Sequence, residues 1–308
     1  MSRTKTQQQP PLTAGTLVAP GYPVLAHLCR TGWLDLYDAW SEQRACRCVV
    51  KVLRPDRSHD QHLRDRLLQE GHWLQAFTHP HLVRAYETRE SPVPHVVLET
   101  LTGETLARLL ERSRRRLAAT DLAQLGLHLC SAVHYLHTRP LLHLDLKPAN
   151  IVIDCRRAKV LDLSIARPPG RGPRGVGTFC YLSPEQAGGG MLTPAADVWG
   201  IGITLYEAAT GELPFDPGES VDSGDDASDS TGTDDWYPQL EGPAPPVTAR
   251  RRLPADLATA IDACLRPDPR DRPSIDELTR TLNLLVPQGR HAPRAPVAES
   301  KETGHSRR

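Results

Sequence analysis

The N-terminal third of the chain carries its apolar residues in short runs that are typical of strands. Residues 47–53 form a β-branched run that predicts a central strand, and residues 95–99 predict another buried strand. Between them, leucines recur at helical spacing over residues 61–77 and predict a helix with one apolar face. This part of the chain is therefore expected to be strand-rich, with one main helix.

After Thr102 and Gly103, which interrupt the last strand, the apolar residues recur with helical spacing. Residues 121–137 place leucines and a valine on one face, and Thr120 or Asp121 is the expected N-cap of this helix. A β-rich half followed by a helical half predicts an α+β, bilobal architecture.

Two later helices are marked by their ends. Residues 197–210 predict an apolar helix that ends at Gly211, a residue suited to the left-handed backbone of a helix C-terminus. Ser274 and Glu277 have the spacing of a capping box and predict the start of a final helix, which should end before Pro287.

Polar segments flank and interrupt the two predicted lobes. We place the N-lobe at residues 21–99 and the C-lobe at residues 104–286, and we expect residues 1–20 and 287–308 to be disordered. An acidic insertion at about residues 216–245 carries nine acids and no lysine or arginine up to residue 241. It is expected to be mobile, because it buries too little apolar surface to offset the entropy lost on ordering.

Composition narrows the possible classes of protein. The 308 residues include 37 acids and 37 bases, so no net charge favours nucleic acid or a membrane surface as a partner. The apolar runs are too short to predict a membrane span, and we expect a cytoplasmic protein. The seven cysteines are scattered, which favours reduced thiols over disulfides or a zinc site. The sequence does not indicate an oligomeric state.

Residues 143–150, HLDLKPAN, place an acid, a base and an amide on one tight loop, and a second acid, Asp162, follows. Phosphoryl transfer needs a carboxylate to accept the proton of the nucleophile, metal ligands near the phosphates and a cation near the transferring charge. Asp145 suits the first role, and Asn150 and Asp162 suit the binding of Mg²⁺ through oxygen. Lys147 suits the third role.

This motif resembles the catalytic and metal-binding loops of bacterial eukaryotic-like serine/threonine protein kinases, and the resemblance extends over about residues 20–286. It implies a bilobal protein-kinase-like fold, ATP and Mg²⁺ as cofactors, and serine or threonine hydroxyls of proteins as substrates. Lys147 resembles the residue of the serine/threonine branch, because tyrosine-directed kinases carry other residues there.

The resemblance also assigns residues to nucleotide binding. Lys51 would bind the α and β phosphates, and Glu70 on the following helix would orient it. Without the catalytic loop, the same two residues would be interpreted as a strand-edge lysine and a solvated helix acid. The full expected nucleotide site consists of Leu28, Leu36, Val49, Lys51, Glu70, Glu99 and Leu101.

Residues 177–185, GTFCYLSPE, resemble the segment on which protein kinases place a substrate peptide. By this resemblance Thr178 should bond to the catalytic loop, Glu185 should form a buried ion pair with Arg272, and Asp197 should brace the loop backbone. The segment favours a protein substrate over the small molecules of other phosphotransferases.

Some positions depart from the family pattern. The three glycines of the phosphate-covering loop are replaced by Cys29, Thr31 and Leu34, which predicts a weak grip on nucleotide because glycine lets the backbone approach phosphate closely. Val49 stands where the family has alanine, and Ser164 stands where it has glycine. These changes leave open a pseudokinase that acts as a scaffold or regulator through its folded surface.

A further departure concerns regulation. Leu144 replaces the catalytic-loop arginine whose charge a phosphorylated activation loop neutralises in the family, and residues 165–177 contain no serine, threonine or tyrosine. Both parts of that switch are missing, so the sequence predicts activity without phosphorylation of this loop. The activating signal and the physiological substrate are not encoded in any pattern that we recognise.

Overall fold

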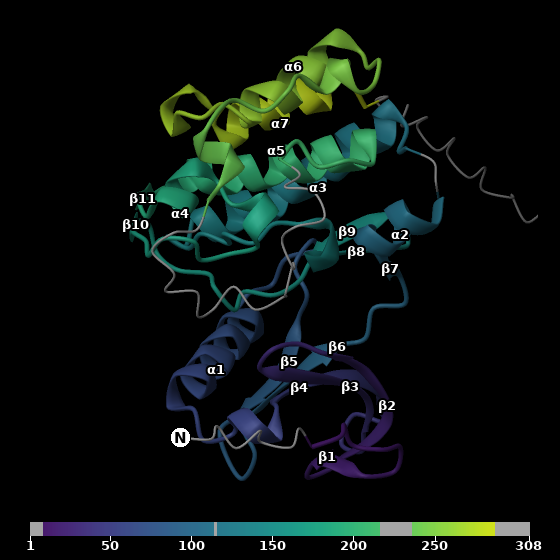
Figure 1. Ribbon diagram of the computed structural model, residues 1–308. Coiled ribbons are helices and arrows are strands. Elements are labelled where there is room, and N and C mark those ends of the chain that lie inside the picture. The colour runs from purple at the N-terminus through teal and green to yellow at the C-terminus, as the bar shows by residue number, and fades with distance from the viewer. Residues whose placement is uncertain (1–8, 114–115, 216–235, 287–308) are drawn as a thin grey trace, which may run out of the picture.

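The computed structural model describes residues 9–113, 116–215 and 236–286. Figure 1 shows two lobes, one built on a curled sheet with helix α1 beside it and the other built mainly of helices. Most of the acidic insertion, at residues 216–235, lies outside the described residues, as do residues 1–8 and the predicted tail at 287–308.

The N-lobe sheet has the strand order β1-β2-β3-β4-β6-β5, and all neighbours are antiparallel. Its central pair, β3 with β4, is in continuous register from Leu34 opposite Leu53 to Ser41 opposite Cys46. The strands are β1 Leu17–Ala19, β2 Tyr22–Arg30, β3 Leu34–Ser41, β4 Cys46–Leu53, β5 Ala85–Arg89 and β6 His95–Glu99.

Helix α1, Gln61–Ala76, packs on this sheet through the leucines that its spacing predicted, including Leu63, Leu67 and Leu74. Asp60 caps it by accepting a hydrogen bond from the backbone N–H of Leu63. Gly71 allows the close approach, because a Cβ there would lie 2.6 Å from Cγ2 of Val96. Residues 61–77, 47–53 and 95–99 were thus assigned to the correct elements.

The C-lobe contains a helical core and short hairpins that face the N-lobe. Its helices are α2 Leu106–Ser113, α3 Ala119–His137, α4 Pro184–Gly188, α5 Pro194–Thr210, α6 Ala255–Cys264 and α7 Ile275–Asn283. Its strands are β7 Glu104–Thr105, β8 Ile151–Asp154, β9 Arg157–Val160, β10 Gly170–Arg171 and β11 Met191–Leu192, which pair as β7-β8-β9 and β10-β11.

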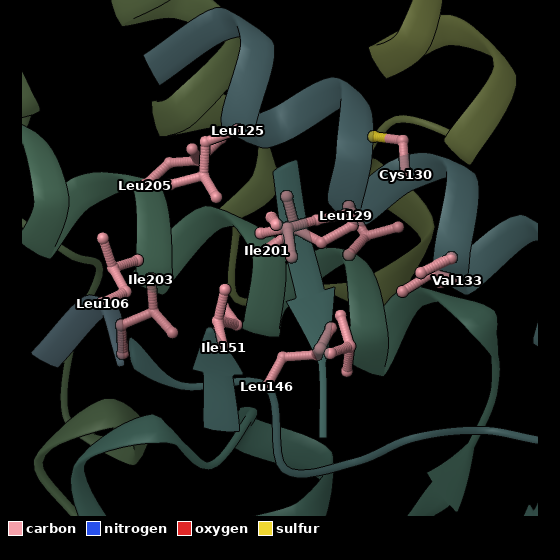
Figure 2. Packing of buried hydrophobic residues seen from close by; sticks show 14 of the residues in the cluster. Leu106, Leu125, Leu129, Cys130, Val133, Leu146, Ile151, Ile201, Ile203 and Leu205 are labelled. Carbon is pink, nitrogen blue, oxygen red and sulfur yellow. The ribbon is translucent and has the colours of Figure 1, made fainter. Parts of the chain in front are cut away.

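Helix α5 is buried along almost its whole length, because its sequence is apolar on every side. Figure 2 shows side chains of α3 and α5 converging on the loop and strand that carry Leu146 and Ile151. The core therefore extends to residues 143–150, and Leu146 anchors this loop in it. Gly211 ends α5 in the left-handed conformation, with φ 78°, and Ser274 and Glu277 form the predicted capping box of α7.

The structure corrects three expectations. Residues 17–19 form strand β1, with Val18 and Ala19 buried on the sheet, so the predicted disorder of residues 1–20 does not hold there. Helix α3 begins after Ala118 without a side-chain cap, because the chain enters the helix before Thr120 and Asp121.

The third correction concerns the acidic insertion. Its C-terminal end packs on the C-lobe, with Tyr237 5% and Gln239 1% exposed, because an aromatic ring and an amide follow the acidic run. Within the described ranges, no helix combines the length and apolar character needed to cross a bilayer.

Candidate active site

A cavity of about 450 Å³ opens between the two lobes, a size that suits a nucleotide. Residues of both lobes line it, including nearly all of those assigned to the site from sequence. These are Leu28, Leu36, Val49, Lys51, Glu99, Leu101, Asp145, Lys147, Asn150 and Asp162. Glu70 lies behind this wall and reaches the cavity through its bond to Lys51.

Lys51 and Glu70 form a buried ion pair. The Lys51 ammonium donates to both carboxylate oxygens of Glu70, at 2.8 and 2.9 Å, and the two residues are 4% and 0% exposed. Burial alone would lower the pKa of Lys51, but Asp162 and Glu70 outweigh it and raise that pKa. The cleft thus holds a permanent cation whose position is fixed by α1.

Asp145 is the centre of a hydrogen-bond cluster on the loop after α3. Thr178 Oγ1 donates to Asp145 Oδ1 at 2.7 Å, and Asn150 Nδ2 donates to Asp145 Oδ2 at 2.8 Å. Lys147 donates to Thr178 Oγ1 at 2.6 Å, and its ammonium lies 3.3 Å from Asp145 Oδ2. The structure therefore brings together the aspartate, asparagine, lysine and threonine that the sequence placed in this site.

Asp197 of α5 holds the backbone of this loop. Its carboxylate accepts from the backbone N–H groups of His143 at 2.9 Å and Leu144 at 2.7 Å, and it is also bonded to His137 at 2.8 Å. Burial would raise the pKa of Asp197, but the bond to His137, together with the histidine charges and the backbone N–H of Leu144, lowers it. The carboxylate holds Leu144 in the left-handed region at φ 67°. L-residues disfavour this region because it brings Cβ too close to the following carbonyl oxygen.

Asp162 projects into the cavity from the turn after β9. Its backbone is also left-handed, at φ 51°, and Ser164 N donates to its Oδ1 at 2.8 Å. Burial would raise its pKa, but the positive charge of Lys51, 3.7 Å away, and the bonds from Ser164 hold that pKa well below its usual range. Asp162 is therefore a carboxylate at every physiological pH.

The donors around Asp162 fit a magnesium ion that also binds phosphate. Asp162 and Asn150 both line the cavity, and they offer a carboxylate and an amide oxygen, the hard ligands that Mg²⁺ prefers. In the described ranges no cluster of three or more histidine, cysteine, aspartate or glutamate side chains could hold a metal by itself.

The segment after the cavity is anchored to the C-lobe as the sequence predicted. Arg272 forms a two-bond ion pair with Glu185, at 2.7 and 2.9 Å. Gln186 Nε2 donates to the carbonyl of Leu144 at 2.8 Å and so ties the segment to the catalytic loop. Gln239, from the end of the acidic insertion, donates to the carbonyl of Leu182 at 3.2 Å.

The phosphate-covering turn between β2 and β3 is held by side chains in place of the expected glycines. Thr31 Oγ1 accepts from Leu34 N at 3.1 Å, and Leu34 is 2% exposed in the main core. Arg54 Nη1 donates to the carbonyls of Thr31 and Gly32, both at 3.1 Å. Thr31 and Leu34, at two of the three glycine positions, therefore stabilise the turn.

The cavity lining also includes residues that the sequence analysis missed, among them Trp33 and Arg66. Trp33 extends from the phosphate-covering turn, and Arg66 extends from α1. Arg66 lies four positions before Glu70, and residues with this spacing share one helix face, so the position of Glu70 was a signal that could have found it. No pattern in the sequence connects Trp33 to that face.

Comparison with known proteins gives consistent matches. A family model described as protein kinase domain matches residues 35–282, a range that begins just after the phosphate-covering turn. Serine/threonine-protein kinase PknB of Mycobacterium tuberculosis is 33% identical over 237 residues, which are 73% of this chain and 36% of PknB. Serine/threonine-protein kinase PkaA of Streptomyces coelicolor is 32% identical over 268 residues, 83% of this chain and 46% of PkaA.

The chain thus spans less than half the length of these relatives. Among solved structures, the crystal structure of the Mycobacterium tuberculosis PknI kinase domain matches with a TM-score of 0.66 and 22% sequence identity. That match covers 90% of this chain and the whole of the PknI chain, and it supports the bilobal fold.

Proposed function

Because the chain belongs to the protein kinase domain family, we propose that it is an ATP- and Mg²⁺-dependent serine/threonine protein kinase. The observation that carries the proposal is the hydrogen-bond cluster of Asp145, which faces the cavity together with the Lys51–Glu70 pair and Asp162. The groups to which we assign phosphoryl transfer lie at one cleft, which supports the proposal. They are Lys51, Glu70, Asp145, Lys147, Asn150 and Asp162.

In this mechanism Asp145 accepts the proton of the substrate hydroxyl. Thr178 and Asn150 orient its carboxylate. The Lys147 ammonium lies 3.3 Å from this carboxylate, where it can stabilise the negative charge of the phosphoryl group during transfer. Lys51, held by Glu70, would bind nucleotide phosphate, and Asn150 and Asp162 would hold Mg²⁺, which neutralises phosphate charge when bound. An apolar surface for the adenine ring lies beside Glu99. It consists of Leu28, Leu36, Val49 and Leu101.

We further propose that the substrate is a protein, since the segment anchored by Glu185 and Gln186 offers a fixed surface beside Asp145. Such a surface would be needless for a small phosphate acceptor. The names of the similar proteins PknB and PkaA, both serine/threonine-protein kinases, support the same substrate class.

We also propose that the protein is active without phosphorylation of its activation loop, residues 165–177. Leu144 is 7% exposed and packs with Leu192 of β11 and Ala196 of α5, and Ile165 of the loop joins this cluster. Apolar packing thus occupies the position where the family has an arginine that pairs with a phosphorylated loop residue. Phosphatase-treated protein should show its full initial rate without a lag, and a lag that shortens as Thr178 becomes phosphorylated would contradict this part.

The rival function is that of a pseudokinase, and the observation that favours it is the side-chain-filled phosphate-covering turn at Thr31 and Leu34. The decisive experiment incubates purified protein with labelled ATP, Mg²⁺ and generic protein substrates. Wild type should transfer phosphate, and Asp145→Asn should lower the rate by about 10²–10⁴-fold. Asp121→Asn, an exposed acid on α3, is the matched control and should behave as wild type.

Two outcomes would overturn the proposal. Wild-type protein that is folded and binds a partner but transfers no phosphate would establish the pseudokinase. Transfer that is undiminished in Asp145→Asn would show that the chemistry lies elsewhere in the cleft.

A further inference from the structure

Arg66 of α1 contacts both walls of the phosphate end of the cavity. Its Nε donates to the carbonyl of Ser164 at 2.6 Å, and its Nη2 donates to Ser164 Oγ at 3.3 Å. The guanidinium also lies over the ring of Trp33, 4.8 Å from the ring centroid. One side chain therefore connects α1, the phosphate-covering turn and the turn that carries Asp162.

The surroundings of Arg66 indicate a built contact and not a solvated side chain resting on the surface. Trp33 is 8% exposed, so its ring is fixed where the guanidinium meets it. Burial lowers the pKa of Arg66, while the carboxylates of Asp162, Glu70 and Asp145 oppose this change, and the guanidinium stays charged. Its planar fork can stack on an aromatic ring and donate two hydrogen bonds at once, which an ammonium cannot do.

The contact reaches the metal-binding carboxylate through one intermediate residue. Arg66 holds Ser164 by its carbonyl and its hydroxyl, and the backbone N–H of Ser164 donates to Asp162 Oδ1 at 2.8 Å. The direction in which Asp162 points therefore depends on where Arg66 places Ser164. Arg54 also holds the phosphate-covering turn, through the carbonyls of Thr31 and Gly32.

We propose that Arg66 is a positioning residue with two effects. It fixes the orientation of the Asp162 carboxylate through Ser164, and it fixes the position of the phosphate-covering turn through Trp33. Its contact with Trp33 adds to the side-chain contacts that hold this turn. This inference rests on the proposed kinase function, since it concerns the same metal and phosphate site. It adds a residue that acts on Mg²⁺ binding through Ser164 and on nucleotide binding through Trp33.

The test measures binding separately from catalysis. Calorimetry gives the Kd of Mg·ATP and of ATP in excess EDTA, and initial rates give the Mg²⁺ concentration for half-maximal transfer. Arg66→Ala should weaken Mg·ATP binding and raise the Mg²⁺ requirement, each about tenfold, as expected for losing one charged hydrogen bond. Binding of metal-free ATP should change less, because it does not need Asp162.

Two further variants separate geometry from charge and from folding. Arg66→Lys keeps the charge but not the fork, and it should resemble Arg66→Ala. Arg64→Ala is the matched control on the same helix, since Arg64 pairs with Glu90 away from the cavity, at 3.1 Å, and it should resemble wild type. A double-mutant cycle with Ser164→Gly should be non-additive, because both substitutions weaken one contact.

The inference is overturned if Arg66→Lys restores wild-type values, since charge alone would then suffice. It is also overturned if Arg66→Ala lowers the melting temperature while the Kd and the Mg²⁺ requirement stay unchanged, or if the cycle is additive. If wild type binds Mg·ATP but transfers no phosphate, the proposed function fails, and the calorimetric comparison still decides the role of Arg66.

Discussion

Removing the carboxylate of Glu185 should leave an uncompensated buried cation in the C-lobe. The side chain of Arg272 is 0% exposed and that of Glu185 is 8% exposed. Besides its two bonds to Glu185, Arg272 donates to the carbonyls of Ala195 at 2.9 Å, Pro267 at 3.0 Å and Arg266 at 2.8 Å. Its guanidinium also lies 5.0 Å from the ring centroid of Trp199.

These contacts set the expected magnitude. Breaking a buried ion pair by removing one partner costs about 3–5 kcal/mol. We expect Glu185→Ala to fall at the lower end, about 3 kcal/mol, because three carbonyls still accept from Arg272. Glu185→Gln should cost about 2 kcal/mol, since its amide oxygen keeps one acceptor while the charge is lost. Against a total stability of about 5–15 kcal/mol, either loss is large.

The assay is urea unfolding at pH 7, followed by tryptophan fluorescence, for both Glu185 variants. The control is Glu212→Ala, whose ion pair with Arg250 is about half exposed on both sides and should cost less than about 1 kcal/mol. The double variant Glu185→Leu with Arg272→Met removes both charges, and it should be more stable than Glu185→Ala alone.

The reasoning would be refuted by a loss below about 1 kcal/mol in Glu185→Ala, which would show that the three carbonyls suffice for Arg272. It would also be refuted if the double variant were less stable than Glu185→Ala. That result would mean that packing around the pair, and not its charge, carries the stability.

Three further predictions concern other parts of the fold. Thr178→Val should lower kcat by about 10–100-fold because it removes both hydrogen bonds at the base, whereas Thr178→Ser should stay near wild type; equal rates would contradict this. Burial lowers the pKa of His128 to about 4, so the unfolded chain takes up that proton first and stability should fall as the pH drops from about 6.5 to 4. Between pH 7 and pH 5, the urea midpoint of His128→Asn should change less than that of wild type. An equal change in both proteins would exclude His128 as the cause. Gly103→Ala should destabilise by about 2 kcal/mol or more, since its Cβ would lie 1.9 Å from the carbonyl oxygen of Ile153, whereas Gly188→Ala meets open space and serves as the control in thermal unfolding.

The sequence predicted those elements whose signal is local. The apolar spacing of α1, the β-branched run of β4 and the capping box at Ser274 each act over a few residues, and the structure agrees with them. The catalytic-loop motif was equally local, and tertiary structure brought Asp145 and Thr178 into contact as the resemblance implied. The catalytic roles themselves stay proposals.

What the sequence could not predict depends on long-range packing. Strand β1 is only Leu17–Ala19, and it exists because β2 offers it a hydrogen-bonding edge. Tyr237 follows an acidic run, and its burial depends on a ring contact with Phe179, whose ring centroid is 5.3 Å away. The contact of Arg66 with Ser164 joins residues 98 positions apart, and no periodicity extends over such a separation.

The bonds of Asp197 have a consequence for how this catalytic loop can diverge. Asp197 accepts from main-chain N–H groups at positions 143 and 144, and every residue except proline supplies that group. The shape of the loop is thus insensitive to which side chain stands at position 144. Exchange of Leu144 for arginine should therefore leave these two bonds, and with them the place of Asp145, unchanged. A side chain at position 144 can thus be exchanged without loss of the main-chain contacts that hold the loop.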